Sequence, residues 1–267
     1  MTAAAQARDR GRGKSSRFGT HPEGGANTLA LVETLRLICA DFDAPPMFRS
    51  TVSGRREGFD PDAAALVARH LGRSIEWIRT TWAEMVPTLL GGRGDAVWCW
   101  LTATDERALV VDFTAPYAYF DDAILVRADS PIREPRDLKG RIVGAVASGN
   151  SSRVARDLGA TVVPFYGVGD HISQMVAALR AGKVQAVVDD DAAWLPLQRE
   201  ADLRVAFRVP TRQPCAAAVS KKRPDLRDEI SRGISAVIAN GSLATAWAAW
   251  LPQLSCPFDR SAAGRST

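Results

Sequence analysis

The stretch "GFDPDAAALVARHLGRSIEWIRT" (residues 58–80) joins a helix pattern to a strand pattern. Apolar residues recur at helical spacing over 60–72, and Gly72 is a typical stop signal at the helix end. Asp60 or Asp62 is predicted to cap the start of this helix, because a carboxylate there accepts hydrogen bonds from free backbone amides. Residues 74–80 then alternate between apolar and polar side chains, as a strand does. The stretch therefore predicts a helix followed directly by a strand.

The same alternation extends in both directions from this stretch. The aliphatic run 35–40 before it predicts a strand, and residues 82–92 and 95–100 after it predict a helix and another strand. This β-α-β-α-β order is typical of a parallel sheet covered by helices. The second half repeats the pattern, with predicted strands at 123–128, 141–147, 161–166, 184–191 and 215–220, and predicted helices at 134–140, 152–159, 170–182 and, as a pair broken at 240–242, 224–251. Two α/β units are therefore predicted.

Composition excludes several classes of protein. The chain has 267 residues, of which 46% are hydrophobic and 24% charged, as in an ordinary globular protein. The net charge is +4, with part of it near the N-terminus and no basic stripe interleaved with aromatic residues, so nucleic acid is not expected as a partner. No run approaches the eighteen or so apolar residues of a membrane span. Residues 1–33 are predicted to form a disordered tail, without the apolar segment of a secretion signal.

Cysteine and histidine spacing gives no sign of a metal site or another cofactor. Cys39, Cys99, Cys215 and Cys256 lack C-x-x-C spacing, and the three histidines are scattered. Buried thiols are the expectation, although a bridge between Cys39 and Cys99 is conceivable if they end neighbouring strands.

Four polar segments follow predicted strands: 40–46, 100–107, 148–152 and 189–193. Ligands of open α/β sheets bind where strands end and loops enter helices, so these segments are the candidate site. Arg107 is suited to bidentate capture of a carboxylate, but spacing alone favours the alternative of a surface ion pair with Asp105, Glu106 or Asp112, because such pairs are common. The three acids at 189–191 repel one another and need a helix N-terminus or a cation beside them. Trp82 is either core or a stacking wall.

Five motifs in a fixed order resemble the family 3 extracellular solute-binding proteins, the receptors of polar amino acid ABC transporters. They are residues 58–72, 82–97, 102–117, 137–152 and 178–193, and the resemblance covers about 35–251. It implies a two-lobed periplasmic-binding-protein-like (type II) α/β fold with a hinge of two crossing strands. Lobe 1 would comprise 34–119 and 214–252, lobe 2 would comprise 120–213, and 253–267 would be a C-terminal tail.

The resemblance also implies a role for individual residues. Arg107 resembles the arginine that grips the ligand's α-carboxylate, Thr102 the hydroxyl residue beside it, and Asp190 the acid that receives the α-ammonium group. Ser151 with Asn150 resembles the lobe 2 loop that completes the carboxylate site. Trp100 stands where the family offers a backbone carbonyl, and Asp41 and Trp82 resemble further pocket residues. Such a trap needs a cation at one end and a carboxylate at the other, both shielded from water.

Some positions depart from the family pattern. Ala44 stands where an aromatic residue is usual, with Phe42 as a substitute, and Trp100 is far bulkier than the residue usual there. The resemblance implies a monomer, outside the cytoplasm, that passes a small zwitterionic ligand, such as an amino acid, to ABC permease subunits. Without a visible signal peptide, a cytoplasmic location stays open.

Two alternatives on the same scaffold remain. One is an enzyme resembling the periplasmic cyclohexadienyl dehydratases, with Glu84, Glu106, Asp189 or Asp191 as general acid. The other is a soluble ligand-sensing module. No nucleophile–base motif is present, so a binding protein without catalytic residues is the expectation.

Overall fold

The computed structural model describes residues 33–147, 149–166 and 170–258 of the chain. The predicted N-terminal tail, apart from Glu33, lies outside these residues, as does 259–267 of the predicted C-terminal tail. Strands of the described part form two five-stranded sheets and one short two-stranded ribbon, β2 (Arg49–Ser50) with β3 (Arg56–Glu57).

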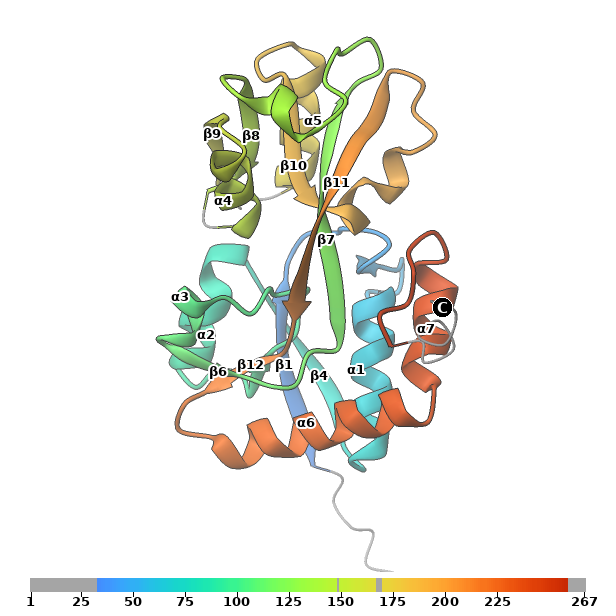
Figure 1. The fold of residues 1–267 in the computed structure, drawn as a ribbon. Helices are drawn as coiled ribbons and strands as arrows, with labels where there is room; N and C mark the ends of the chain where they lie inside the picture. Colours follow the sequence, from blue (N-terminus) through green and yellow to red (C-terminus); the bar gives the residue numbers. More distant parts are fainter. Residues whose placement is uncertain (1–32, 148, 167–169, 259–267) are drawn as a thin grey trace, which may run out of the picture. The chain divides into compact units, whose positions relative to one another are not determined.

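The first sheet has the order β4-β1-β5-β12-β6. Its strands are β1 (Thr34–Ala40), β4 (Ser74–Thr80), β5 (Ala96–Val97), β6 (Val111–Phe113) and β12 (Ala218–Ser220). β1 pairs in parallel with both β4 and β5, which confirms the predicted β-α-β-α-β unit. Helices α1 (Phe59–His70) and α7 (Ser242–Trp250) lie on one side of this sheet (Figure 1). Helix α2 (Met85–Leu90), preceded by the turn η1 (Trp82–Glu84), lies on the other side. Helix α6 (Pro224–Ala239) packs against α1 and α7.

The second sheet has the order β11-β7-β10-β8-β9. Its strands are β7 (Ala118–Arg127), β8 (Ile142–Val146), β9 (Thr161–Phe165), β10 (Ala186–Asp190) and β11 (Leu203–Cys215). Helices α4 (Asn150–Asp157) and α5 (His171–Arg180) follow β8 and β9, and the short turns η2 (Pro135–Leu138) and η3 (Asp191–Leu197) complete this part. β10 is parallel to β8 and antiparallel to β7.

Strands β7 and β11 connect the two sheets. They pair antiparallel from Leu203 opposite Arg127 to Cys215 opposite Ala118, with two irregularities in register, and run side by side out of the second sheet (Figure 1). At their far ends Tyr117 donates its amide to the Cys215 carbonyl at 2.9 Å, and the chain continues into β12 of the first sheet. This is the predicted two-lobed α/β fold with two crossing strands.

Three local predictions need correction. Neither Asp60 nor Asp62 caps α1, because the N-cap is Gly58 at φ 132°, where a Cβ atom would meet the Met47 carbonyl oxygen at 2.4 Å. The predicted strand 95–100 pairs only at Ala96–Val97. The long strand β11 was not predicted, because its alternation is interrupted by prolines and arginines whose pairing partners lie in distant β7.

Aromatic side chains fill the core beside the first sheet. Trp98 stacks on Tyr117 with ring centroids 4.5 Å apart, and Trp247 contacts Phe59 at 5.2 Å and Phe120 at 5.4 Å. Aromatic pairs of this kind contribute about 1 kcal/mol each beyond the area they bury. Cys39, Cys99 and Cys215 are buried thiols outside any disulfide, so the Cys39–Cys99 bridge that the sequence left open is not formed.

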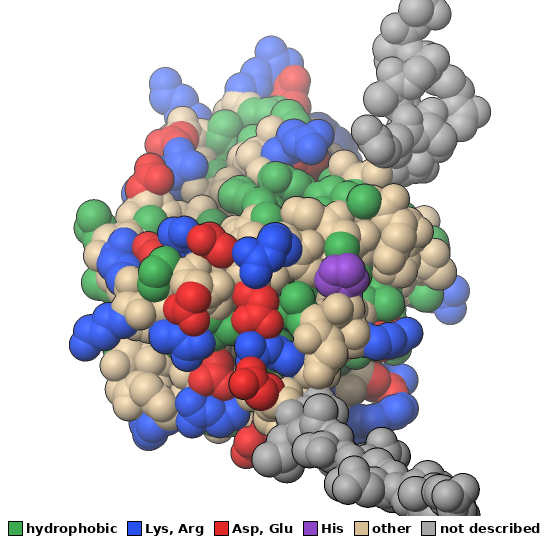
Figure 2. Space-filling model, turned by 90° about the horizontal axis from the view of Figure 1, so that it is seen from below, with side chains coloured by type: hydrophobic (Ala, Val, Ile, Leu, Met, Phe, Trp, Pro, Cys, Tyr) green, Lys and Arg blue, Asp and Glu red, His purple; other side chains and the backbone are tan. Residues whose placement is uncertain are grey.

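Charged groups of both signs share the face that α6 forms. Figure 2, seen from below, shows Lys and Arg side chains interspersed with Asp and Glu over this face. Arg227 approaches Asp228 at 2.8 Å and Asp112 at 3.5 Å, and Arg223 approaches Asp225 at 3.0 Å. Exposed pairs of this kind stabilise a fold little, because water screens them. No helix of the described residues is long and apolar enough to cross a membrane.

Candidate ligand-binding site

One cavity brings the four predicted polar segments together. The strands β1, β5, β8 and β10 that precede them end around it, as expected for parallel strands. Its lining residues are Phe42, Ala44, Phe48, Trp82, Trp100, Thr102, Arg107, Val146, Gly149, Asn150, Ser151, His171, Ile172, Asp189 and Asp190. The cavity has a volume of about 60 Å³, enough for a few waters.

Arg107 enters the cavity from a short helix that the sequence did not predict. α3 (Asp105–Ala108) begins after Thr104, whose hydroxyl oxygen accepts a hydrogen bond from the Arg107 amide at 3.3 Å. The guanidinium donates to the Thr102 carbonyl at 2.8 Å. Burial lowers the pKa of Arg107, although it stays cationic at any physiological pH. Its remaining donors are available to a ligand.

The alternative of a surface ion pair for Arg107 is wrong. Among the described residues Arg107 pairs with no carboxylate within 4 Å, and Asp112 instead pairs with Lys221 at 3.1 Å and Arg227 at 3.5 Å. A half-buried cation without a carboxylate partner is the arrangement expected for a site that receives an anion.

The three adjacent acids at the end of β10 have three different environments. Asp189 lines the cavity with its Oδ2 atom 3.9 Å from His171 Nε2, and Asp191 turns away and pairs with Arg208 at 3.4 Å. Asp190 also lines the cavity and makes no ion pair with a described residue. Its backbone amide donates to Asp189 Oδ1 at 2.8 Å, and no side chain of the three caps η3.

Burial and mutual repulsion raise the pKa values of these acids. Burial raises the pKa of Asp189 to about 6, with His171 opposing the shift. Burial, and then the charges of Asp189 and Asp122, raise the pKa of Asp190 well above its ordinary value, while Arg107 opposes the rise. A cation beside Asp190 would relieve this cost, because it favours the charged form.

Ser151 and Asn150 lie in the first turn of α4 and are held by an acid that the sequence did not single out. Ser151 Oγ donates to Asp122 Oδ1 at 2.6 Å, and Asn150 Nδ2 donates to Asp122 Oδ2 at 3.3 Å. Asp122 is fully buried and also accepts from Thr211 Oγ1 at 2.7 Å. The hydroxyl of Ser151 is therefore engaged within the protein, whereas the first amides of α4 have no partner inside the helix.

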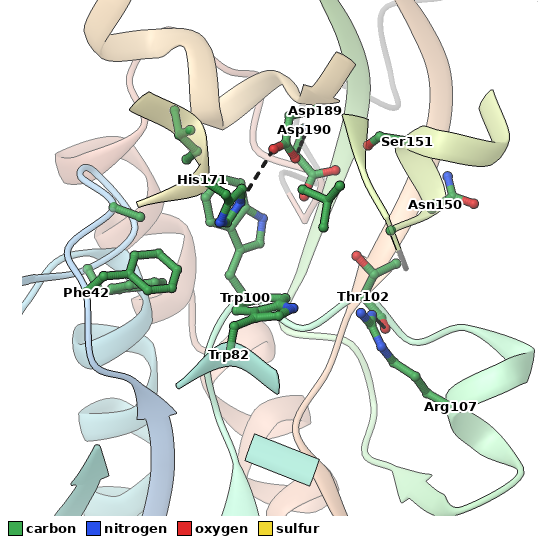
Figure 3. Close-up of a pocket in the computed structure, with 15 residues that line it drawn as sticks. Phe42, Trp82, Trp100, Thr102, Arg107, Asn150, Ser151, His171, Asp189 and Asp190 are labelled. Atoms are coloured by element: carbon green, nitrogen blue, oxygen red, sulfur yellow. Dashed lines mark hydrogen bonds and ion pairs between the residues drawn. The ribbon is translucent and has the colours of Figure 1, made fainter. Parts of the chain in front are cut away.

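An aromatic wall forms the other side of the cavity. Phe42 lies 5.6 Å from His171 and 6.5 Å from Trp82, measured between ring centroids, and Trp82 lies 6.3 Å from His171 (Figure 3). Phe42 lines the cavity together with Ala44, so the departure at Ala44 does not leave this side without an aromatic ring. Trp82 is half-buried and faces the cavity, which favours the stacking-wall interpretation over the core one.

Trp100 has an unusual backbone conformation. Its φ angle of 49° is in the left-handed region, where a bulky residue is rare, and its amide donates to Tyr117 Oη at 3.1 Å. The ring packs edge-on against Phe120 at 5.6 Å. These contacts fix the indole at the cavity.

Seven of the eight predicted site residues line this cavity: Arg107, Thr102, Trp100, Asp190, Ser151, Asn150 and Trp82. Asp41 does not, since its side chain is exposed and its amide bonds to the Thr80 carbonyl at 2.9 Å. The sequence did not identify His171 or Asp122 as residues of the site, and it named Asp189 only within the segment 189–193 and as a candidate general acid of the enzyme alternative. Asp189 was visible as part of the acidic triplet, whereas neither His171 nor Asp122 stands in a motif that would have revealed it. Among the described residues, no cluster of three His, Cys, Asp or Glu side chains is placed to hold a metal ion.

Comparison with known proteins identifies the family. Residues 37–253 match the model of the bacterial extracellular solute-binding proteins, family 3. The chain belongs to this family. A probable amino-acid ABC transporter-binding protein of Haemophilus influenzae is 27% identical over 195 residues, which cover 72% of this chain and 74% of the relative.

Solved structures of the same architecture carry amino acids. An ancestral arginine-binding protein bound to arginine is 29% identical, with a TM-score of 0.70, over 82% of this chain and 98% of that one. An ancestral amino acid-binding protein, described as a precursor of cyclohexadienyl dehydratase, is 25% identical, also with a TM-score of 0.70, over 81% and 95%. The family 3 member described here therefore shares its two-lobed fold with amino acid-binding proteins.

Proposed function

We propose that this family 3 protein captures a polar amino acid or a similar small zwitterion between its lobes and delivers it to an ABC importer. The observation that carries the proposal is that Arg107 and Asp190, two side chains of opposite charge, line the same cavity. Arg107 comes from the side of the first sheet and Asp190 from the second, and neither side chain makes an ion pair with a described residue. A half-buried cation and a half-buried acid, neither of which makes an ion pair with a described residue, match the two charged ends of a zwitterion.

The other predicted residues would complete the two ends of the ligand. Thr102 and the first amides of α4, at Asn150 and Ser151, supply donors beside Arg107, and a helix N-terminus attracts an anion. Trp82 and Trp100 would enclose the ligand's aliphatic part. Asp41 stands outside the cavity in this structure, so a role for it requires a rearrangement of its loop.

The family and its relatives support the remaining parts of the proposal. The Haemophilus influenzae relative is described as an ABC transporter-binding protein, which supports permease subunits as partners and a periplasmic or extracellular location. We assign 34–119 with 214–252 to lobe 1 and 120–213 to lobe 2, because β7 and β11 cross near these limits. The protein acts as a monomer in this proposal.

Calorimetric titration with a panel of amino acids tests the proposal. At least one member should bind, and Arg107→Ala should weaken its binding about 100-fold or more, because the variant leaves the ligand carboxylate buried without a cation. Arg180→Ala is the matched control, since Arg180 is an exposed arginine of α5 that pairs with Asp202 at 2.7 Å and does not line this cavity. Equal affinities for Arg107→Ala and the wild type would rule out the assignment.

A second candidate function is catalysis on the same scaffold. One observation favours it: Asp189 lies beside His171 in the cavity and has a pKa raised to about 6, in the range suited to a general acid. The other acids considered for this role, Glu84, Glu106 and Asp191, do not line the cavity. Incubation with prephenate or arogenate, followed by absorbance, decides the matter, and product formation that Asp189→Asn abolishes would establish the enzyme.

A further inference from the structure

The indole N–H of Trp100 is a buried donor with no acceptor. Among the described residues, Trp100 Nε1 has no hydrogen-bond partner and almost no exposure to water, although the ring lines the ligand cavity. A buried N–H without an acceptor destabilises a protein, so such groups in native structures call for an explanation. A ligand atom in the cavity would supply the missing acceptor.

The place of Trp100 in the chain indicates which part of a ligand this is. Only Leu101 separates Trp100 from Thr102, whose carbonyl accepts a hydrogen bond from the Arg107 guanidinium at 2.8 Å. Trp100, Thr102 and Arg107 all line the cavity, so Trp100 lies on its Arg107 side. That side carries the unpaired guanidinium and would receive the ligand's carboxylate. The Trp100 backbone is held by the hydrogen bond from its amide to Tyr117 Oη, and the ring packs against Phe120 at 5.6 Å, so the ring cannot swing aside without losing the Phe120 contact.

The same ring limits the room for a ligand side chain. The cavity has a volume of about 60 Å³, and four rings border it: Trp100, Trp82, Phe42 and His171. Once a carboxylate and an ammonium group occupy it, little space remains. His171 Nδ1 is a second buried polar atom without a partner among the described residues, and it can meet a small hydroxyl group.

We propose that Trp100 determines specificity in this site: its N–H donates to the ligand's carboxylate beside Arg107, and its ring restricts the ligand to glycine, alanine or serine. This inference rests on the proposed function and makes it narrower. It sets the protein apart from the arginine-bound relative, whose ligand has a long side chain.

Trp100→Phe tests the hydrogen bond. The variant keeps an aromatic ring and removes the N–H, so affinity for the best small amino acid should fall about tenfold or more, as expected for a lost bond to a charged group. Trp98→Phe is the matched control. Trp98 Nε1 is also buried without a described partner, but this residue stacks on Tyr117 and does not line the cavity. Its affinity should equal that of the wild type.

Trp100→Gly tests the restriction on size. Glycine adopts the φ angle of 49° without strain, so the variant should fold, which circular dichroism checks. The wild type should bind serine or alanine at least tenfold more tightly than glutamine or arginine. Trp100→Gly should reduce this preference at least tenfold, because the space of the indole becomes available to a longer side chain.

The outcomes separate this inference from the proposed function. Wild-type protein that binds arginine or glutamine more tightly than serine, or Trp100→Phe with unchanged affinity for the small ligand, would overturn the role of Trp100 and leave amino acid binding intact. Loss of binding in Arg107→Ala together with unchanged selectivity in Trp100→Gly would likewise overturn the role of Trp100 and support amino acid binding. Absence of binding to every amino acid would overturn both.

Discussion

At the scale of single residues, Asp190 carries the strongest electrostatic constraint in the cavity. It is one of three consecutive acids, yet Asp191 has Arg208 and Asp189 has His171 nearby, whereas Asp190 has only the more distant charge of Arg107 to oppose the rise in its pKa. In the free protein Asp190 therefore takes up a proton at a higher pH than an ordinary aspartate does. An ammonium group bound beside it would lower that pKa again, because an opposite charge favours the carboxylate.

Ligand binding should consequently release a proton from the protein. In the complex the pKa of Asp190 should be low, and in the free protein it is raised. At a pH between these two pKa values, Asp190 carries a proton in the free protein and none in the complex. Affinity for the ligand should therefore increase with pH across this window and weaken toward pH 5. Asp189, with a pKa of about 6, adds to the change near that pH.

Calorimetry at a series of pH values from 5 to 7, in buffers of different ionisation enthalpy, measures this release. The observed binding enthalpy should vary with the buffer in the wild type. Asp190→Asn, which has no proton to lose there, should bind weakly and show much less variation, while Asp41→Asn, outside the cavity, should match the wild type. A binding enthalpy that is independent of the buffer in the wild type would contradict the role of Asp190.

At the scale of elements, Asp122 joins three pieces of the second lobe. This buried acid on β7 accepts hydrogen bonds from Thr211 of β11 and from Ser151 and Asn150 of α4. It therefore fixes the start of α4, whose first amides face the cavity, to the pair of strands that connects the sheets. The position of the proposed anion site depends on this one side chain.

Asp122→Ala should destabilise the protein by about 3 kcal/mol, because it leaves buried hydroxyl and amide donors without an acceptor. Urea unfolding measures the change. Asp121→Ala is a control on the same strand, where a half-buried carboxylate accepts one bond from the Arg212 amide at 2.9 Å, and it should cost about 1 kcal/mol or less. Equal losses in the two variants would show that Asp122 has no special place in the connection.

Elements and motifs also set the limit of prediction from sequence. The helix and strand patterns around 58–80 and the order of the motifs were enough to predict the fold, and Arg107 and Thr102 follow from their motif. His171 and Asp122 were missed because their importance depends on partners far along the chain, such as Phe42 and Thr211. The left-handed backbone of Trp100 is likewise a tertiary effect, since local preference for a bulky residue opposes it.

At the scale of the whole molecule, the proposed ligand joins the two lobes. Within the described part of the chain, β7 and β11 are the strands that run between these lobes. Arg107 and Asp190 reach the cavity from different sheets, so only the folded chain brings them together. A ligand that binds the folded state alone stabilises it according to its concentration relative to Kd. Stabilisation of the whole chain is thus a test of binding that needs no knowledge of the contacts.

Ligand at about 1,000 times its Kd should raise the free energy of unfolding by about 4 kcal/mol. Urea unfolding followed by circular dichroism measures the shift, with and without ligand. At the same ligand concentration Arg107→Ala and Asp190→Asn should each lose most of the stabilisation, because removing either end of the bridge releases the ligand from one lobe. Arg180→Ala, outside the cavity, should retain it. Both lobes should unfold in one transition when the ligand is present. If the ligand shifted only part of the unfolding signal, with the rest unchanged, it would be bound to one lobe alone and the bridge between Arg107 and Asp190 would be wrong.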